Sequence, residues 1–239
     1  MQKLVIFSGA GMSAESGIAT FRDQDGLWEK HRVEDVATPD AWQRDPALVQ
    51  GFYNERRKQI IAASPNAAHQ AIAALEQHFD VHVITQNIDD LHERAGSSKV
   101  LHLHGNIRFA KSSAPLSLYE DEVYFPIEGW ELNVSRDFCP KGFPLRPHVV
   151  WFGEAVPAFE PAIELVQQAD IFMVIGTRLA VYPVASLVYE IASHCRAFYI
   201  DPQAQLQQLP PQYESIAMTA SEGLNHVISQ IAPTVKISD

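Results

Sequence analysis

Short apolar runs recur along the chain, and glycine or polar residues follow most of them. Continuous runs predict strands buried on both faces of a parallel sheet. The predicted strands are 4–7, 81–85, 100–103, 149–154, 171–175 and 197–200. Stretches with helical spacing lie between them, and the predicted helices are 47–62, 67–78, 161–168, 182–195 and 224–231. This alternation predicts an α/β fold with a doubly wound, Rossmann-like parallel sheet.

The α/β rhythm stops in one part of the chain. Residues 106–146 are rich in aromatic residues and proline, and they predict a second, smaller lobe inserted into the core. We expect residues 31–64 to belong to the same lobe, with a helix that starts at Asp45-Pro46. The Rossmann-like core then comprises about 1–30, 65–105 and 147–239, within a single catalytic domain.

The first predicted strand runs into Gly9-Ala10-Gly11, a turn that only glycine makes easily. Ser13 and Glu15 have the character of helix-start residues, so unpaired helix N–H groups are expected to face the turn. This is the pattern of a pyrophosphate cradle, although Ala14 stands where the third glycine of the fingerprint would be. A simple tight turn between strand and helix is the alternative interpretation.

Four predicted strands end in small or polar residues. These ends are Gly9–Gly11, Gln86–Asp89, His104-Gly105 and Gly176-Thr177. Ligands of open α/β sheets bind outside the carboxyl ends of the strands. The sequence therefore predicts a ligand site at this edge of the sheet.

Composition narrows the function classes. The chain has 239 residues and a formal net charge of −11, which argues against a general nucleic-acid binder. No apolar run reaches membrane-spanning length, so no membrane partner is expected. The two cysteines, Cys139 and Cys195, cannot build a disulfide framework and favour a reducing, cytoplasmic location. We expect a monomer.

The assembled motifs resemble the sirtuin family of NAD-dependent protein deacylases. The matching segments are GAGMSAESGIATFRD (9–23), TQNIDDLHERAG (85–96), HLHG (102–105), LRPHVVWFGE (145–154) and GT-x-L-x-VYP (176–183). The resemblance implies an enzyme that uses NAD as co-substrate and acts on acylated lysine in proteins or peptides. It also implies a set of NAD-binding residues: Gly9, Ala10, Gly11, Ser13, Phe21, Arg22, Gln86, Asn87, Asp89, Gly176 and Thr177.

The resemblance assigns catalysis to His104, with Asn87 and Asp89 beside the nicotinamide. In the family, the acyl oxygen attacks the ribose C1′ as nicotinamide leaves, and the histidine then takes a proton from a ribose hydroxyl. Histidine suits this step because its ordinary pKa lies near neutrality. His102 lies on the same face of its strand, but the matching family position is not catalytic.

The resemblance also implies substrate-binding residues. Val150, Phe152 and Gly153 match the segment that pairs with the substrate peptide as an added strand, although an ordinary edge strand is the alternative. Tyr53 and Arg56 match the Tyr-x-x-Arg pair of sirtuins that remove succinyl or malonyl groups. The alternative is that Tyr53 is an ordinary core residue and that Arg56 belongs to a run of charged residues on the solvated face of the helix.

The sequence departs from the family at two places. Most members bind a structural zinc through four cysteines, but only Cys139 remains here, so we expect a lobe without zinc that packs around its aromatic residues. Arg178 and Tyr199 replace smaller residues at the nucleotide end. These changes keep two rivals to deacylation open: NAD hydrolysis or ADP-ribosyl transfer, and a non-catalytic NAD-binding module.

Overall fold

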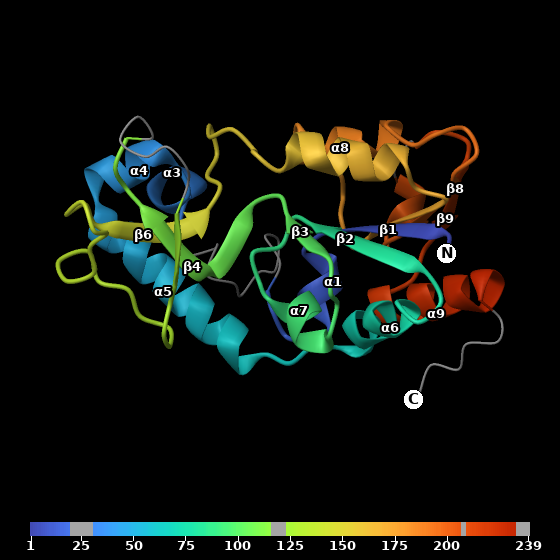
Figure 1. Cartoon of the computed structure of the whole chain (residues 1–239), viewed down its shortest axis with the longest axis horizontal. Coiled ribbons are helices and arrows are strands. Elements are labelled where there is room, and N and C mark those ends of the chain that lie inside the picture. The colour runs from blue at the N-terminus through green and yellow to red at the C-terminus, as the bar shows by residue number, and fades with distance from the viewer. Residues whose placement is uncertain (20–30, 116–122, 207–208, 233–239) are drawn as a thin grey trace.

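A six-stranded parallel sheet forms the larger part of the molecule (Figure 1). The computed structural model describes residues 1–19, 31–115, 123–206 and 209–232. The strands lie in the order β3-β2-β1-β7-β8-β9. Their bounds are β1 (Lys3–Ser8), β2 (Asp80–Thr85), β3 (Val100–His102), β7 (Ile171–Ile175), β8 (Arg196–Ile200) and β9 (Tyr213–Ile216).

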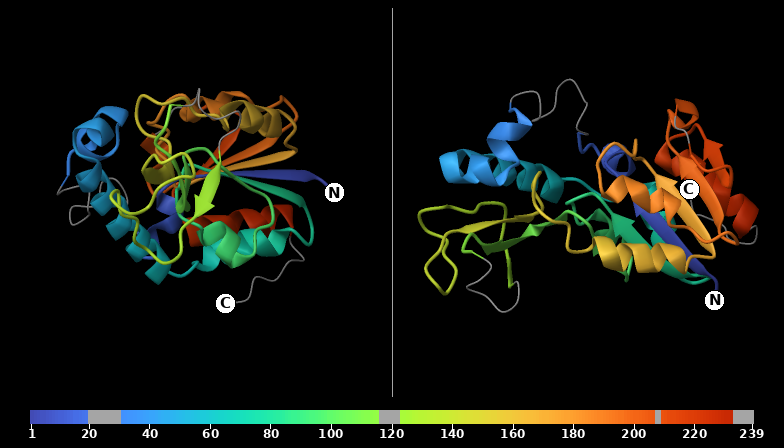
Figure 2. Two further views of the ribbon diagram at one scale, coloured as in Figure 1. Left: turned by 60° about the vertical axis from the view of Figure 1, so that its left-hand side comes forward. Right: turned by 90° about the horizontal axis from the view of Figure 1, so that it is seen from above.

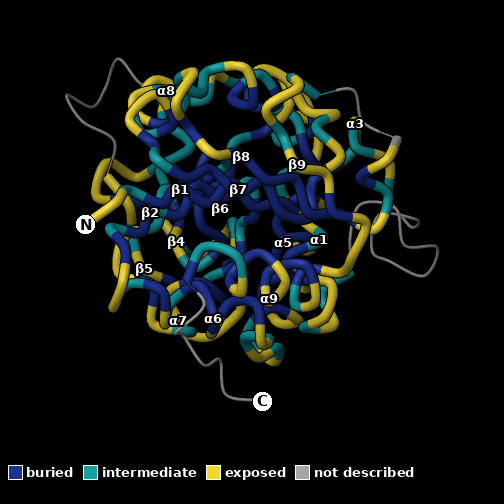
Figure 3. The backbone as a smooth tube through the Cα atoms, turned by 90° about the vertical axis from the view of Figure 1, so that its right-hand side faces the viewer, coloured by how far each residue is buried: buried dark blue, intermediate teal, exposed yellow. Residues whose placement is uncertain are grey.

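Helices cover both faces of this sheet, which confirms the doubly wound α/β prediction (Figure 1). One face packs on α6 (Ala67–Leu75) and α9 (Ala220–Ile231), with α7 (Leu91–Ala95) beside α6. The other face packs on α8 (Phe159–Gln167) and on a 3₁₀ helix, Val184–Tyr189. The central strands are buried on both sides, as their continuous apolar runs require (Figure 3).

The strand order reverses at β1. From β1 the chain proceeds through β2 to β3 on one side, and later through β7, β8 and β9 on the other. Connections leave the sheet in opposite directions at such a switch point, and ligands of doubly wound sheets bind there. The carboxyl ends of β1, β2 and β7 are therefore neighbours.

The smaller lobe projects from the carboxyl side of the sheet (Figures 1 and 2). It contains a three-stranded antiparallel sheet in the order β5-β4-β6, which the sequence rhythm did not predict. Its elements are α3 (Val33–Val36), α4 (Pro39–Arg44), α5 (Pro46–Ala62), β4 (Gly105–Ser112), β5 (Tyr124–Pro126) and β6 (Leu145–Val149). Asp45 caps α5 by accepting the Leu48 N–H at 2.9 Å, so the predicted helix start is confirmed.

The core of the smaller lobe differs from the predicted aromatic cluster. Beneath β4 the buried residues are Ala110, Ile127 and Leu132, whereas Trp130 and Phe138 are exposed. Short aliphatic side chains fill a thin layer without leaving polar ring atoms to satisfy. Phe125 packs against this group, so the predicted aromatic residues contribute to this part of the core only in part.

A buried arginine ties this core to α5. Arg57 is fully buried and donates to the backbone carbonyls of Ile107 and Trp130 at 2.7 and 2.8 Å. It also donates to the Asn54 side chain at 2.9 Å, and Asn54 pairs with both backbone groups of Leu132. The run of charge on α5 is therefore only partly a solvated helix face.

Several predicted elements end elsewhere. The predicted strand 149–154 is wrong, because β6 ends at Val149 and residues 150–154 form an irregular loop. The predicted helix 182–195 is reduced to the 3₁₀ helix Val184–Tyr189, and a second 3₁₀ turn spans Ala204–Leu206. Strand β9 was not predicted, because its exposed residues, Glu214 and Ser215, break the apolar pattern.

Among the described helices, none combines the length and apolar character of a bilayer span.

Candidate active site

The turn after β1 packs against the turn after β7. Gly9 N–H donates to the Ile175 carbonyl at 3.0 Å, and Gly11 N–H donates to the Gly176 carbonyl at 2.8 Å. A Cβ at Gly9 would lie 2.6 Å from Thr177 Cβ, and one at Gly11 would lie 2.8 Å from Gly176 Cα. Glycine is required here by contact between two parts of the protein as much as by a ligand.

The predicted helix start is corrected. Helix α1 spans only Gly11–Ala14, and Ala10 precedes it without a side-chain cap. Met12 and Ser13 N–H groups donate to the carbonyls of Gly9 and Ala10, so they are not the unpaired donors that a phosphate cradle was expected to offer. Ser13 lies buried inside α1, and its hydroxyl bonds to side chains of the loop after β2 instead of capping the helix.

Ser13 joins the turn after β1 to the loop after β2. Its hydroxyl donates to Asp89 Oδ2 at 2.9 Å and accepts from Asn87 Nδ2 at 3.0 Å. Asp89 also accepts the Leu91 N–H at 3.2 Å. Burial raises the pKa of Asp89, and the hydrogen bonds from Leu91 and Ser13 oppose that rise. The three predicted residues therefore form one buried polar cluster.

His104 lies in the turn between β3 and β4. Its Nδ1 is 3.0 Å from the Gln86 carbonyl oxygen, which only accepts, so Nδ1 carries the proton of the neutral ring. The lone pair of neutral His104 is then on Nε2. Burial lowers the pKa of His104, with the Gln86 hydrogen bond opposing it. The ring is thus held as the neutral tautomer that a general base requires.

Gln86 connects the end of β7 to the loop after β2. Its side chain donates to the Thr177 hydroxyl at 3.0 Å, which links the loops after β2 and β7. The predicted residues at the ends of β1, β2, β3 and β7 are therefore brought together, apart from Phe21 and Arg22, which lie outside the described residues. The cluster of predicted side chains therefore lies at the carboxyl ends of β1, β2 and β7, where the reversal of strand order also predicts a ligand site.

Tyr53 and Arg56 lie on α5, in the smaller lobe. Tyr53 is buried with Phe52 and Trp151, and burial raises the pKa of its phenol to about 12. Burial lowers the pKa of Arg56, while the Tyr53 and Asp89 side chains oppose that fall through their charge. Arg56 therefore lies within electrostatic reach of both the tyrosine and the Asp89 loop.

An ion pair and backbone hydrogen bonds hold the loop after β6 in place. Arg146 donates to both carboxylate oxygens of Glu154, at 2.7 and 2.9 Å, and its guanidinium carbon lies 3.3 Å from the centre of the Trp151 ring. Glu154 also accepts the Trp151 N–H at 2.8 Å. Val150 N–H donates to the His104 carbonyl at 2.9 Å, which holds the loop beside the turn of the predicted base.

Comparison with known proteins decides the family. The model of the Sir2 family matches residues 9–183. The chain belongs to the Sir2 family. It is 47% identical over 234 residues to a protein of Helicobacter pylori named NAD-dependent protein deacylase, covering 98% of this chain and 97% of that protein. An Aggregatibacter actinomycetemcomitans protein of the same name is 52% identical over 198 residues, covering 83% and 92%.

A solved structure confirms the fold of this Sir2 protein. The crystal structure of a Sir2 homologue in complex with NAD superimposes with a TM-score of 0.83 at 37% identity. The match covers 98% of this chain and 91% of that chain. The combination of a parallel sheet and a separate small sheet is therefore that of Sir2 structures.

Tyr199 and Arg178 have different surroundings. Tyr199 is fully buried in β8, and its hydroxyl donates to the Thr177 carbonyl at 2.7 Å. The tyrosine thus supports the turn after β7, a structural role that its sequence position did not indicate. Arg178 is exposed beside the same turn.

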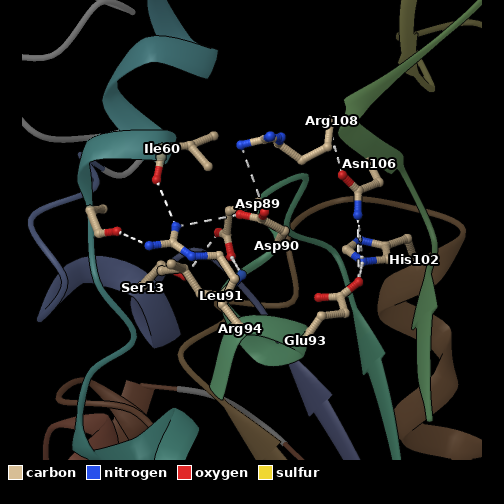
Figure 4. A network of polar contacts seen from close by, with 11 residues as sticks. Ser13, Ile60, Asp89, Asp90, Leu91, Glu93, Arg94, His102, Asn106 and Arg108 are labelled. Carbon is tan, nitrogen blue, oxygen red and sulfur yellow. Dashed lines mark hydrogen bonds and ion pairs between the residues drawn. The ribbon is translucent and has the colours of Figure 1, made fainter. Parts of the chain in front are cut away.

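Two pairs of functional interest were missed from the sequence. Arg146 and Glu154 brace the loop after β6, and Glu93 lies 2.7 Å from His102 (Figure 4). All four residues stand inside the quoted family motifs, which is the signal that could have found them. Their partners could not be deduced, because each pair joins different elements.

Proposed function

We propose that this Sir2 protein is an NAD-dependent protein deacylase that acts on acylated lysine. The observation that carries the proposal is His104, held with Nδ1 toward the Gln86 carbonyl and Nε2 as acceptor, beside the Asn87–Asp89 cluster. The names of the relatives support the same activity.

The residues present suit NAD as co-substrate. Gly9, Gly11 and Gly176 keep side chains out of the turns at the switch point, and Asp89 offers a buried carboxylate that can accept from the nicotinamide carboxamide. When bound, NAD supplies the glycosidic bond whose carbon becomes the electrophile for the acyl oxygen. In our proposal His104 Nε2 takes the proton of a ribose hydroxyl, and the Gln86 carbonyl stabilises the resulting imidazolium through Nδ1.

The test is to incubate the protein with NAD and acyl-lysine peptides. Nicotinamide and acyl-ADP-ribose should appear in equal amounts, as followed by mass spectrometry. Nicotinamide without acyl-ADP-ribose would indicate hydrolysis or ADP-ribosyl transfer instead. No NAD consumption would favour the non-catalytic module.

We further propose that the preferred acyl groups are succinyl and malonyl. Tyr53, with its raised pKa, stays a neutral phenol that can donate to a carboxylate, and the half-buried Arg56 guanidinium can bind one through two hydrogen bonds. Such charge-assisted contacts contribute about 1.5–3 kcal/mol, which corresponds to roughly ten- to a hundred-fold in discrimination.

Matched succinyl- and acetyl-lysine peptides test this preference through kcat/KM. Arg56→Met should remove the succinyl preference, whereas Lys58→Met, an exposed cation on the same helix, should keep it. Equal efficiency of the wild-type protein on both peptides would contradict the proposal.

We also propose that the smaller lobe folds without the family's zinc. The donor set does not fit a four-cysteine site, since Cys139 is the one cysteine of the lobe and accepts a hydrogen bond from the Ser112 hydroxyl at 3.3 Å. Elemental analysis of protein purified without added metal should give far less than one zinc per chain. Stoichiometric zinc that survives a chelator would overturn the proposal.

A further inference from the structure

Two histidines at the end of β3 hold consecutive carbonyls of the loop after β2. His102 Nδ1 lies 3.0 Å from the Asn87 oxygen, and His104 Nδ1 lies 3.0 Å from the Gln86 oxygen. The two rings therefore have the same relation to the loop. They differ at the other nitrogen, which decides what each ring can do.

The Nε2 atom of His102 faces Glu93 of α7 at 2.7 Å (Figure 4). A carbonyl oxygen and a carboxylate oxygen both accept, so both ring nitrogens of His102 must donate. Only the imidazolium does so. The Arg108 N–H donates to Asn106 Oδ1 at 2.9 Å, and the Asn106 amide nitrogen lies 3.3 Å from His102 Nε2 and 3.5 Å from Glu93 Oε1. The 2.7 Å contact is much the shorter one, so Glu93 is the main partner of Nε2.

The charges around His102 favour this cation. Burial acts to lower the pKa of His102, but the hydrogen bond and charge of Glu93 and the Asn87 carbonyl outweigh it, so the pKa is raised. The charged and titratable groups that act on it are Glu93 and His92 from α7 and Asp89 from the loop. Arg108 and Arg94 pair with Asp90 at 3.9 and 3.6 Å.

We infer that His102 is a positioning residue, an imidazolium paired with Glu93 that fixes the Asn87 carbonyl and thereby the Asn87–Asp89 loop. The inference rests on the proposed role of this loop in binding nicotinamide. Deprotonation of His102 removes the donor to one of its two oxygen partners and loosens the loop. Activity therefore declines on the alkaline side as His102 loses its proton, whereas loss on the acid side belongs to His104.

Glu93→Gln tests the charge while leaving an oxygen that accepts from Nε2. Its matched control is Glu76→Gln, because Glu76 also accepts a hydrogen bond beside α7, from the Ser98 N–H at 2.7 Å, without a histidine. The ring pKa of His102 is measured by ¹⁵N NMR on the full chain. The kcat/KM for NAD and the nicotinamide inhibition constant are measured over the same pH range.

Glu93→Gln should lower the ring pKa of His102 and move the alkaline limb of kcat/KM down by the same amount. At pH values between the ring pKa values of the two proteins we expect about a five-fold loss and weaker nicotinamide inhibition, since an ionised hydrogen bond exceeds a neutral one by about 1 kcal/mol. Glu76→Gln should change neither. His102→Gln, which still donates to the Asn87 carbonyl, should abolish the alkaline limb.

Two results would overturn the inference. One is a His102 ring that is neutral at pH 7 in the wild-type protein. The other is a Glu93→Gln protein whose ring pKa falls while the kinetic limb stays in place. A wild-type protein without acyl turnover would contradict the proposed deacylase instead, and the NMR titration would still decide the charge of His102.

Discussion

At the scale of single residues, hydrogen-bond partners separate two histidines that stand two positions apart in the sequence. His102 and His104 both use Nδ1 to hold a carbonyl of the same loop. The Glu93 carboxylate accepts from Nε2 of His102, whereas among the residues that the structure describes the Gln86 carbonyl is the one hydrogen-bond partner of the His104 ring. One ring is therefore suited to carry a fixed charge and the other to exchange a proton.

His104→Ala should lower kcat/KM for deacylation by about 10²–10⁴-fold, the usual contribution of a general base. A base must be neutral, and burial lowers the pKa of His104, so on the acid side wild-type activity should fall as the pH drops below the ordinary histidine pKa of about 6.5. The measurement is kcat/KM from pH 5 to 9. His78→Ala, an exposed control, should match the wild type, and a loss of only a few-fold in His104→Ala would refute the assignment.

At the scale of elements, the site depends on how closely the turns after β1 and β7 approach. Gly176 has φ of +63°, a conformation that favours glycine, and its Cα faces the backbone of α1. Thr177 accepts hydrogen bonds from the Tyr199 hydroxyl of β8 and from the Gln86 side chain at the end of β2. The segments that follow β1, β2 and β7 thus form one unit, which β8 supports through Tyr199.

Gly176→Ala should disrupt this unit, because the added Cβ would lie 2.4 Å from the Met12 backbone nitrogen. We expect a lower Tm and weaker NAD binding, measured by thermal unfolding with and without NAD. Gly51→Ala is the matched control: Gly51 lies within α5, and its added Cβ meets nothing within 4 Å. That variant should be stabilised by about 0.5–1 kcal/mol, and equal behaviour of the two would contradict the packing argument.

At the scale of the whole molecule, buried polar residues join α6 and α7 to the carboxyl ends of β1 and β2. His92 contacts the Ser8 side chain at 3.0 Å, Ser8 donates to Thr85 at 2.9 Å, and the His69 and His92 rings lie 4.8 Å apart. Both histidines are buried, which lowers the pKa of His69 to about 4 and that of His92 well below its ordinary value. The layer under the site therefore requires neutral imidazoles.

This layer predicts an acid-dependent stability. The unfolded chain binds protons on these histidines below about pH 6.5 and the folded chain does not, so stability falls as the pH drops. Each histidine adds a slope of about 1.4 kcal/mol per pH unit. The shift of His102 has the opposite sign: its contribution is fully present below about pH 6.5 and is lost as the pH rises above that value, outside the range in which His69 and His92 act.

Urea unfolding from pH 5 to 7 measures the slope. His92→Gln keeps a side chain that can hydrogen-bond with Ser8 but cannot titrate, so the slope should decrease by about 1.4 kcal/mol per pH unit. His78→Gln, at an exposed position, should leave it unchanged. An unaltered slope in His92→Gln would show that the folded state already accommodates the charged ring.

The sequence by itself determined the strand–helix alternation and the residues at the strand ends. Continuous apolar runs specify strands buried on both faces, and Gly9, Gln86, His104 and Gly176 stand where those runs stop. Parallel strands bring such ends to one edge, so local pattern was enough to predict a shared site. The irregular loop after Val149 escaped prediction because apolar residues that fill a core between elements resemble a strand.

Only the tertiary structure decided which partners each polar residue meets. Hydrogen bonds and burial depend on elements distant in sequence: Glu93 with His102, Tyr199 with Thr177, and Arg57 with Trp130. Tautomer, charge state and pKa follow from those partners, because desolvation and neighbouring charges act through space. The same physics explains why α5 carries a buried Arg57 next to an exposed Lys58, a difference that their adjacent positions cannot encode.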